Sequence, residues 1–228
     1  MELTPYYDKD ITCLHCKEIF PTTKVRTKFI KVVETASDFQ PIYKEVNGIY
    51  YNVHVCEHCG FSFTDDFSKY FAPGTQDLIQ QEITNKWVHR SYNGERTVFQ
   101  AMEAYKLALV CGTLKKEKNV AMAGLALRLG WLYRSLNNEG QEERFLTLAR
   151  DYYAESYSTG DYSGTQMSEI RMLYMIAELS RRIGDIDEAT RSFSRIIEKQ
   201  STATEPKIID MAKEQWQLIR EEKEKVHY

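Results

Sequence analysis

Two closely spaced cysteine pairs carry the clearest chemistry in this sequence. Each pair has two residues between its cysteines, in the segments TCLHC (12–16) and VCEHCG (55–60). A loop of this length presents two sulfurs to one ion, and two such loops supply the four thiolates of a closed tetrahedral metal site. The spacing therefore predicts one metal centre with four ligands: Cys13, Cys16, Cys56 and Cys59.

Zinc is the ion that this ligand set favours, because four thiolates complete its tetrahedral shell. Iron in the same sulfur geometry is the alternative, and a redox dithiol is a weaker one. With all four positions filled by protein, no position is left for an activated water. We therefore expect one structural Zn²⁺ without a catalytic role. Gly60, directly after the second pair, suits the sharp turn of such a knuckle.

Three histidines, His15, His54 and His58, lie beside the knuckles. One interpretation makes one of them a ligand or a catalytic base. The simpler interpretation is that they point outward, because four sulfurs already complete the shell. The fifth cysteine, Cys111, lies in LALVCGTL with no histidine or acid at helical spacing. It is interpreted as a small buried residue at a helix end rather than as a nucleophile.

Composition and charge narrow the function classes. The 228 residues include 30 Lys and Arg against 33 Asp and Glu, which gives a net charge of −3. This balance argues against a protein whose whole surface binds nucleic acid or another polyanion. Lys24, Arg26 and Lys28 would share one strand face, which predicts either a small nucleic-acid contact or a plain solvated face. Five cysteines in this pattern favour a reducing cytoplasm, and neither a signal peptide nor a membrane span is expected.

The elements that position the cysteines change type near residue 72. Before it, the alternation over residues 24–29 predicts a half-exposed strand. Strands are also expected over 42–46 and 49–55, joined by a type I′ turn at Asn47-Gly48, where both central residues would take positive φ. A strand that ends at Val55 would place the second knuckle at a hairpin tip, as in a zinc ribbon.

From residue 76 onward the apolar residues recur at helical spacing, and short Gly or Asn turns separate six to eight expected helices. One such turn is expected at Cys111-Gly112, and a long amphipathic helix over 208–226 would cap the C-terminal end. The predicted fold class is α+β. A small β-rich, zinc-ribbon-like domain occupies residues 1–72, and an all-α helical repeat domain occupies residues 73–228.

The helical half carries a repeated pattern of small and large residues. One copy matches the tetratricopeptide-repeat (TPR) spacing clearly, at Leu173, Ile176, Ala177, Gly184, Ala189 and Phe193. Two further copies, one starting at Leu129-Gly130 and one around Ala101 and Tyr105, are degenerate. Residues 97–200 thus resemble the TPR superfamily.

The chain as a whole resembles an uncharacterised bacterial family that pairs a two-knuckle cysteine domain with TPR-like helices. The resemblance covers nearly the full length, through TPYYDKDITCLHCKEIF, VCEHCGFS and the repeats. It implies the architecture and no established activity.

The TPR resemblance also implies which residues would face a partner. In that class the first helix of each pair lines a concave groove, and the matching positions here combine arginines with aromatic residues: Trp131, Arg134, Arg171, Tyr174, Arg181 and Arg182. Arginine forks favour carboxylate or phosphate, and aromatic rings give rigid apolar anchors. We expect an acidic, aromatic peptide in this groove. The alternative is that the arginines pair with Glu178 and neighbouring acids.

These features predict a non-enzymatic cytoplasmic adaptor that binds a protein or peptide through its helical groove. The sequence has no phosphate-binding glycine loop, metalloprotease motif or nucleophile elbow, which argues against an enzyme. A nucleic-acid-associated regulator is the second hypothesis. A helical-repeat sensor of a small ligand or signalling peptide is the third, because one fold serves many functions.

Overall fold

The computed structural model describes residues 3–201 and 204–226. Strands come first: β1 (Tyr6–Thr12), β2 (Ile19–Val25), β3 (Val32–Thr35), β4 (Pro41–Tyr43), β5 (His54–Val55) and β6 (Ser62–Phe63). Helices follow: α1 (Thr75–Glu82), α2 (Val98–Lys115), α3 (Asn119–Ser135), α4 (Glu139–Thr159), α5 (Glu169–Arg182), α6 (Ile186–Glu198) and α7 (Pro206–Val226). The predicted α+β class is confirmed.

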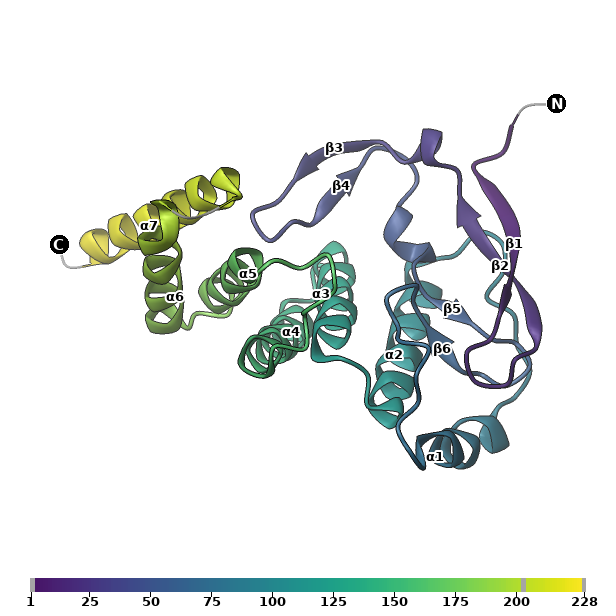
Figure 1. Ribbon diagram of the computed structural model, residues 1–228. Coiled ribbons are helices and arrows are strands. Elements are labelled where there is room, and N and C mark those ends of the chain that lie inside the picture. Colours follow the sequence, from purple (N-terminus) through teal and green to yellow (C-terminus); the bar gives the residue numbers. More distant parts are fainter. Residues whose placement is uncertain (1–2, 202–203, 227–228) are drawn as a thin grey trace.

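The strands form three separate antiparallel hairpins. β1 pairs with β2 from Tyr6↔Val25 to Thr12↔Ile19, and β5 pairs with β6. One cysteine pair lies in the loop of each of these two hairpins. β3 pairs with β4, and this third hairpin extends like an arm from the other strands toward α5 (Figure 1).

The second strand ends at Val25, so the expectation that it continues through residue 29 is wrong. Its partner β1 begins at Tyr6, and the preceding Pro5 accepts a hydrogen bond from Arg26 N at 2.9 Å but has no N–H to return. The ladder stops there, and Thr27–Phe29 forms a 3₁₀ turn.

Asn47-Gly48 does not form the expected type I′ turn, and Gly48 does not take a positive φ. Asn47 instead caps a 3₁₀ helix over residues 48–51, and its side chain accepts a hydrogen bond from Ile49 N at 3.0 Å. Ile49 is only 4% exposed, and its burial favours this helical turn over an open hairpin. β4 therefore pairs with the preceding β3.

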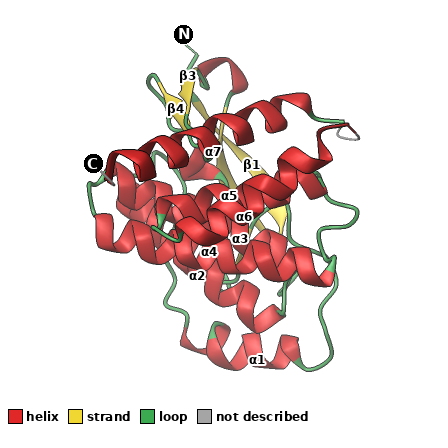
Figure 2. Ribbon diagram, turned by 90° about the vertical axis from the view of Figure 1, so that its left-hand side faces the viewer, coloured by secondary structure: helices red, strands yellow, loops and turns green. Residues whose placement is uncertain are grey.

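The helices pack in successive hairpins. α3 packs on α4, α5 packs on α6, and α7 lies across α6 (Figure 2). The turn expected at Cys111-Gly112 is wrong, because α2 continues to Lys115. Gly112 is instead a close contact between α2 and α3, where a Cβ would lie 2.4 Å from the Met122 sulfur.

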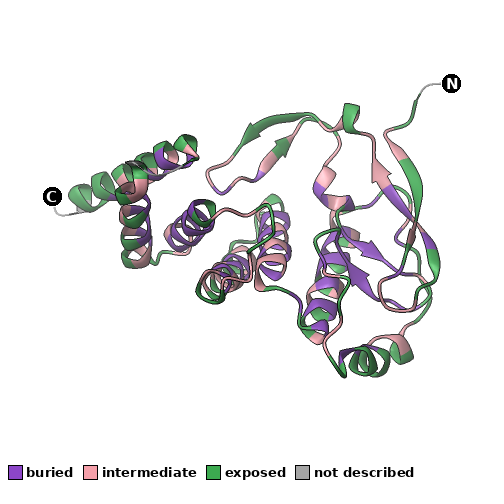
Figure 3. Cartoon of the chain, in the orientation of Figure 1, coloured by how far each residue is buried: buried purple, intermediate pink, exposed green. Residues whose placement is uncertain are grey.

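One buried apolar cluster runs through the strand region and the helices. β5 and β6 are buried, whereas β3 is exposed along its length (Figure 3). Hydrogen bonds reinforce this packing: Tyr105 Oη donates to Ile49 O at 2.9 Å, and the buried Arg96 guanidinium donates to Val53 O at 2.9 Å. Burial lowers the pKa of Arg96 to about 10, so the group remains charged at neutral pH.

Candidate metal centre and helical groove

The four predicted cysteine ligands come together in the fold. Cys13 Sγ lies 3.6 Å from Cys59 Sγ, Cys16 Sγ lies 3.7 Å from Cys56 Sγ, and all four sulfurs lie within 4.8 Å of one another. All four are free thiols. Four thiolates at about 2.3 Å from one ion would stand about 3.8 Å apart in a tetrahedron. The cluster therefore has the dimensions to hold one metal ion.

The two cysteine knuckles share one backbone design. Lys17 N donates to Cys13 O at 3.2 Å, and Gly60 N donates to Cys56 O at 2.8 Å. The donor residue takes a positive φ in both knuckles, 68° at Lys17 and 75° at Gly60. That conformation is free of strain for glycine and costs about 1–2 kcal/mol for lysine. The two tight loops thus aim their sulfurs at one point.

Trp87 covers the second knuckle. Its indole Nε1 donates to Glu57 O at 2.8 Å, and a Cβ on Gly60 would lie 2.4 Å from its ring. The sequence indicates a turn at Gly60. It gives no sign of the approaching ring, because Trp87 lies outside the cysteine motif.

The crowded thiols do not ionise alike: hydrogen bonds with Cys13 and Cys59 lower the pKa of Cys56. Hydrogen bonds with Cys13 and Cys56, together with burial, raise the pKa of Cys59. A bound cation would lower the pKa of these thiols, because thiolate is the form that binds metal. Cys111 is separate from the cluster: it is fully buried in α2, Ser62 N donates to its sulfur at 3.3 Å, and burial raises its pKa to about 12. Its thiol remains protonated and packs as a small core group.

The neighbouring histidines do not belong to the sulfur cluster, which among the described residues consists of the four cysteines. His58 is exposed, with Nε2 3.3 Å from Ile19 O. His15 packs beside Phe61, with ring centroids 5.8 Å apart, and burial lowers its pKa.

The buried His54 is the centre of a polar group that the sequence did not suggest, and this group reaches the surface at Asp65. Its Nδ1 lies 3.2 Å from Thr22 Oγ1, and its Nε2 lies 3.0 Å from Asp65 Oδ1 and 3.2 Å from Lys24 Nζ. Hydroxyl, imidazole and carboxylate in this order are the groups of a nucleophilic triad. Thr22 is 1% exposed and His54 is 0% exposed, so the hydroxyl cannot meet a substrate. The group links β2 to β5.

The basic residues expected to share a strand face are engaged separately. Lys24 Nζ pairs with Asp65 at 3.2 Å, and the Arg26 guanidinium lies over the Tyr7 ring, 4.9 Å from its centroid. Lys28 lies beyond the strand, in the 3₁₀ turn. Lys24, Arg26 and Lys28 therefore do not form a continuous stripe along β2.

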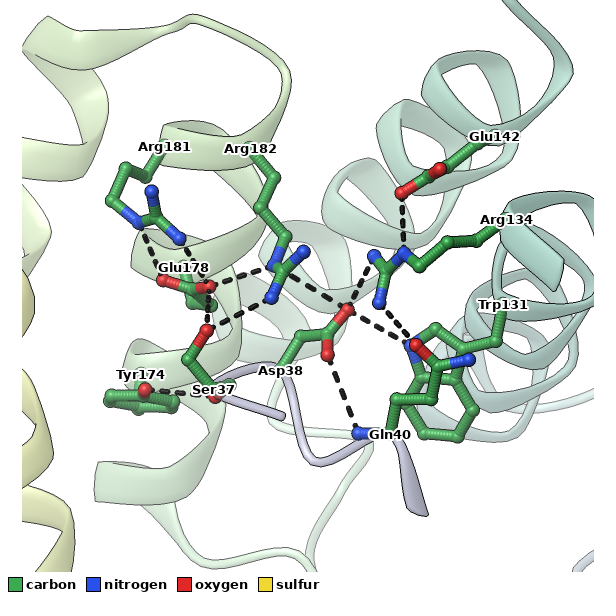
Figure 4. Close-up of polar contacts among 10 residues, drawn as sticks. All are labelled: Ser37, Asp38, Gln40, Trp131, Arg134, Glu142, Tyr174, Glu178, Arg181 and Arg182. Carbon is green, nitrogen blue, oxygen red and sulfur yellow. Dashed lines mark hydrogen bonds and ion pairs between the residues drawn. The ribbon is translucent and has the colours of Figure 1, made fainter. Parts of the chain in front are cut away.

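A segment of the chain itself lies on the face of α3 and α5 where the groove was expected. The turn between β3 and β4, residues 36–40 and here called the hairpin tip, lies against α3 and α5 (Figure 4). The six predicted groove residues lie around the hairpin tip. Arg181 reaches it through Glu178, and the other five contact it directly: Trp131, Arg134, Arg171, Tyr174 and Arg182. The sequence predicts an acidic, aromatic occupant, and the hairpin tip contains Asp38-Phe39.

Asp38 anchors the hairpin tip on α3. Its fully buried carboxylate accepts hydrogen bonds from Trp131 Nε1 at 3.0 Å and Arg134 Nη2 at 2.8 Å, and Arg182 Nε lies 3.5 Å away. Burial raises the pKa of this carboxyl, but the hydrogen bond from Arg134 and the two positive charges outweigh it, so the pKa lies below its ordinary value. Arg134 Nη1 also donates to Gln40 Oε1 at 2.5 Å.

Ser37 anchors the hairpin tip on α5. Its carbonyl accepts a hydrogen bond from Tyr174 Oη at 2.9 Å, and its Oγ donates to Glu178 Oε1 at 2.7 Å. Arg182 Nη2 donates to the same Oγ at 2.9 Å. Glu178 is fully buried and pairs with Arg181 and Arg182, each at 2.8 Å. These two arginines thus pair with Glu178, as the alternative interpretation held, and the network also holds the tip.

Phe39 completes the hairpin tip in a strained conformation. Its φ is 65°, at a position after a tight turn where glycine is usual. Such a conformation costs of order 1–3 kcal/mol and persists only where the surroundings fix it. Here the ring lies 5.4 Å from that of Tyr174, and the Arg171 guanidinium lies 5.7 Å from its centroid. Contacts with the helices, rather than the local preference of the turn, fix the tip.

A family model described as "Uncharacterized protein conserved in bacteria (DUF2225)" matches residues 6–219. The chain belongs to this family. The matched region includes both cysteine pairs, the hairpin tip and the helices around it. No curated protein and no solved structure matches the chain. In the described part of this DUF2225 chain, each helix is too short or too polar to cross a bilayer.

Sequence reasoning assigned no role to the hairpin tip of this DUF2225 chain. The bonds from Ser37 to Glu178 and from Asp38 to Trp131 join residues 141 and 93 positions apart, so no local periodicity reports them. The available signal is a Ser-Asp pair, which favours turns, near two strand-forming segments. That signal locates a turn but not its docking site.

Proposed function

We propose that this DUF2225 chain is a non-enzymatic binding scaffold. Four cysteines hold one structural Zn²⁺, and the concave helical face recognises a short acidic, aromatic turn of a protein partner. The docking of the hairpin tip carries this proposal, because the tip brings one carboxylate between Trp131 and Arg134 and one aromatic ring against Tyr174. The helical hairpins α3–α4 and α5–α6 support a TPR-like interpretation of that face.

The zinc assignment rests on four sulfurs at tetrahedral spacing with no disulfide among them. Four protein ligands close the shell, which favours a structural role. Paired thiols kept as metal ligands suit a reducing compartment, and we place the protein in the cytoplasm on that basis. Elemental analysis of the purified protein should find one zinc per chain, and Cys59→Ser should lose it. One iron per chain, or no metal, would contradict the assignment.

The hairpin tip acts in this proposal as an intramolecular stand-in for the partner. A tethered segment competes at an effective concentration in the millimolar range. A partner must therefore bind the helical face more tightly than the tip does, or meet it when the hairpin is undocked. The exposed strand β3, which leads into the tip, has few side chains to hold the arm in place.

The test uses the chain's own tip as a probe. A fluorescein-labelled peptide of residues 34–42 is titrated into the wild type and into a tip variant with Ser37→Gly, Asp38→Gly and Phe39→Gly. We expect the tip variant to bind the peptide at least tenfold more tightly than the wild type, because the competitor is gone. A peptide with asparagine in place of the aspartate is the matched control and should bind weakly.

Two results would contradict the groove assignment. One is that a folded tip variant, with wild-type helical circular dichroism, does not bind the peptide. The other is unchanged binding after Arg134→Ala and Arg182→Ala are added to the tip variant, since these arginines supply the donors for aspartate and serine.

A further inference from the structure

Three adjacent hollows lie between the β3–β4 hairpin, the strand region and helices α3–α5. Their volumes are about 450, 340 and 210 Å³, and Arg128 lines all three. Four residues line both of the larger two: Arg128, Tyr153, Met167 and Arg171. We call this shared region the Arg128 cleft. The two larger hollows have the size of sites for small organic molecules.

Arg128 differs from the other arginines of the concave face. Arg134 pairs with Asp38 and Glu142, and Arg171 pairs with Glu205. The Arg128 guanidinium, among the described residues, donates one hydrogen bond, from Nη1 to Gly124 O at 3.0 Å, and pairs with no carboxylate. Most of its donors therefore remain available to an anion in the cleft.

Two tyrosines also line the cleft. Tyr153 is 3% exposed, and Tyr43 is half-buried on the hairpin side of the second hollow. Neither hydroxyl forms a hydrogen bond with a described residue, although a buried tyrosine usually has a partner. Arg128 and Tyr153 line the same two hollows, and burial raises the pKa of Tyr153 to about 12 against the opposing charge of Arg128. Tyr153 thus remains a neutral donor at pH 7.

The second hollow adds mostly apolar side chains to the cleft, with Asn52 as a polar one. Met167 is shared by both larger hollows, and the second adds Leu127, Trp131, Pro41 and Met175 without any acidic residue. The acidic residues that line these hollows are Asp66, in the first and the third, and Asp65, in the third. An anion is therefore best placed at the shared region, with its body in the second hollow.

We infer that the Arg128 cleft binds a small organic oxyanion, a carboxylate or phosphate monoester, that carries a flat apolar body. The head group would accept hydrogen bonds from Arg128 and Tyr153, and the body would pack between Trp131 and Met167. The hairpin forms one wall, so the ligand needs the tip docked as it is here. The inference does not require that a partner peptide binds the helical face.

The test compares four probes by calorimetric titration of the full chain. Phenylacetate and phenyl phosphate carry both features, benzyl alcohol carries only the body, and inorganic phosphate carries only the anion. We expect saturable binding of at least one of the first two and much weaker binding of the other two. Which of the two binds distinguishes a carboxylate site from a phosphate site. The methyl signals of Met167 and Met175 should shift in a ¹³C-methionine NMR spectrum.

Variants locate the site. Arg128→Gln should weaken binding roughly tenfold or more, because it removes a charge-assisted pair. Tyr153→Phe, which breaks no protein hydrogen bond, should weaken anion binding several-fold. This variant replaces Arg128→Gln in the test if that variant is unstable. Arg150→Gln, an arginine on α4 paired with Asp151 and Asp185, is the control and should bind as the wild type does. Absence of binding by both anions, equal binding by Arg128→Gln, or equal affinity for inorganic phosphate would overturn the inference.

Discussion

At the second cysteine knuckle, one missing side chain determines how closely Trp87 can cover the site. Gly60 has a φ of 75°, and a Cβ there would lie 2.4 Å from the Trp87 ring. Gly60→Ala should lower the free energy of unfolding by roughly 2–5 kcal/mol, the sum of a backbone cost of about 1–2 and a packing cost of about 1–3. Urea denaturation measures the loss.

Gly160→Ala is the matched control for that prediction. Gly160 has a φ of 71° at the end of α4, and a Cβ there would meet nothing within 4 Å. Only the backbone cost of about 1–2 kcal/mol applies. If the two variants lose equal stability, Trp87 does not press on the knuckle.

Asp38 gives the hairpin tip a defined pH dependence. Arg134, Arg182 and Trp131 hold the pKa of this buried carboxyl below its ordinary value of 3.8. Asp38 therefore stabilises the folded chain fully above that value, and the contribution is lost as the pH falls through the lowered pKa. Asp38→Asn should cost about 2–3 kcal/mol at pH 7. The difference in melting temperature between wild type and variant should shrink below pH 3.8, and a constant difference down to pH 2 would contradict this.

At the scale of elements, the β3–β4 hairpin gains little stability from its own strands. It has two short strands with a shift in register, and β3 is exposed throughout. An isolated two-stranded hairpin is marginal in water. Loss of the tip contacts in the Ser37→Gly, Asp38→Gly, Phe39→Gly variant should therefore raise amide hydrogen exchange over residues 31–44 by an order of magnitude or more. Exchange over β1 and β2 should not change.

Val33→Thr is the control for the exchange measurement. Val33 lies on β3 with 63% of its side chain exposed, away from the tip contacts. This variant should exchange as the wild type does. If the tip variant also matches the wild type, the arm is held by its own strands rather than by docking.

The same elements separate what the sequence could predict from what it could not. The four cysteines are close because each pair is local and each lies in a hairpin loop, so spacing alone located the cluster. The predictions of a strand over 24–29 and of a turn at Asn47-Gly48 were wrong because contacts outside each segment determine its conformation. Pro5 ends the ladder of β1 and β2, and burial of Ile49 favours a 3₁₀ helix. The hairpin tip was missed because each of its partners lies more than 90 residues away.

At the scale of the whole molecule, two groups of contacts join the described strand region to the helices at opposite ends of the arm. On the side of the four-cysteine cluster, β5 and β6 pack on α2, and Tyr105 bonds to Ile49. At the far end of the arm, the hairpin tip bonds to α3 and α5. Because β5 and β6 pack on α2, loss of order at the cysteine loops should also destabilise the helices.

Metal removal tests this coupling. The loop of the second cysteine pair joins β5 and β6, which are buried and pack on α2, so chelation should lower the melting temperature of the helical circular dichroism signal as well. A loss of about 4 kcal/mol would lower it by roughly 10 °C in a chain of this size, because each kcal/mol shifts it by about 2–4 °C. Cys59→Ser should reproduce the shift without chelator. Cys111→Ala, at a cysteine outside the cluster, should keep its metal and its response to chelator. An early transition that leaves helical melting unchanged would mean that the strand region and the helices unfold independently.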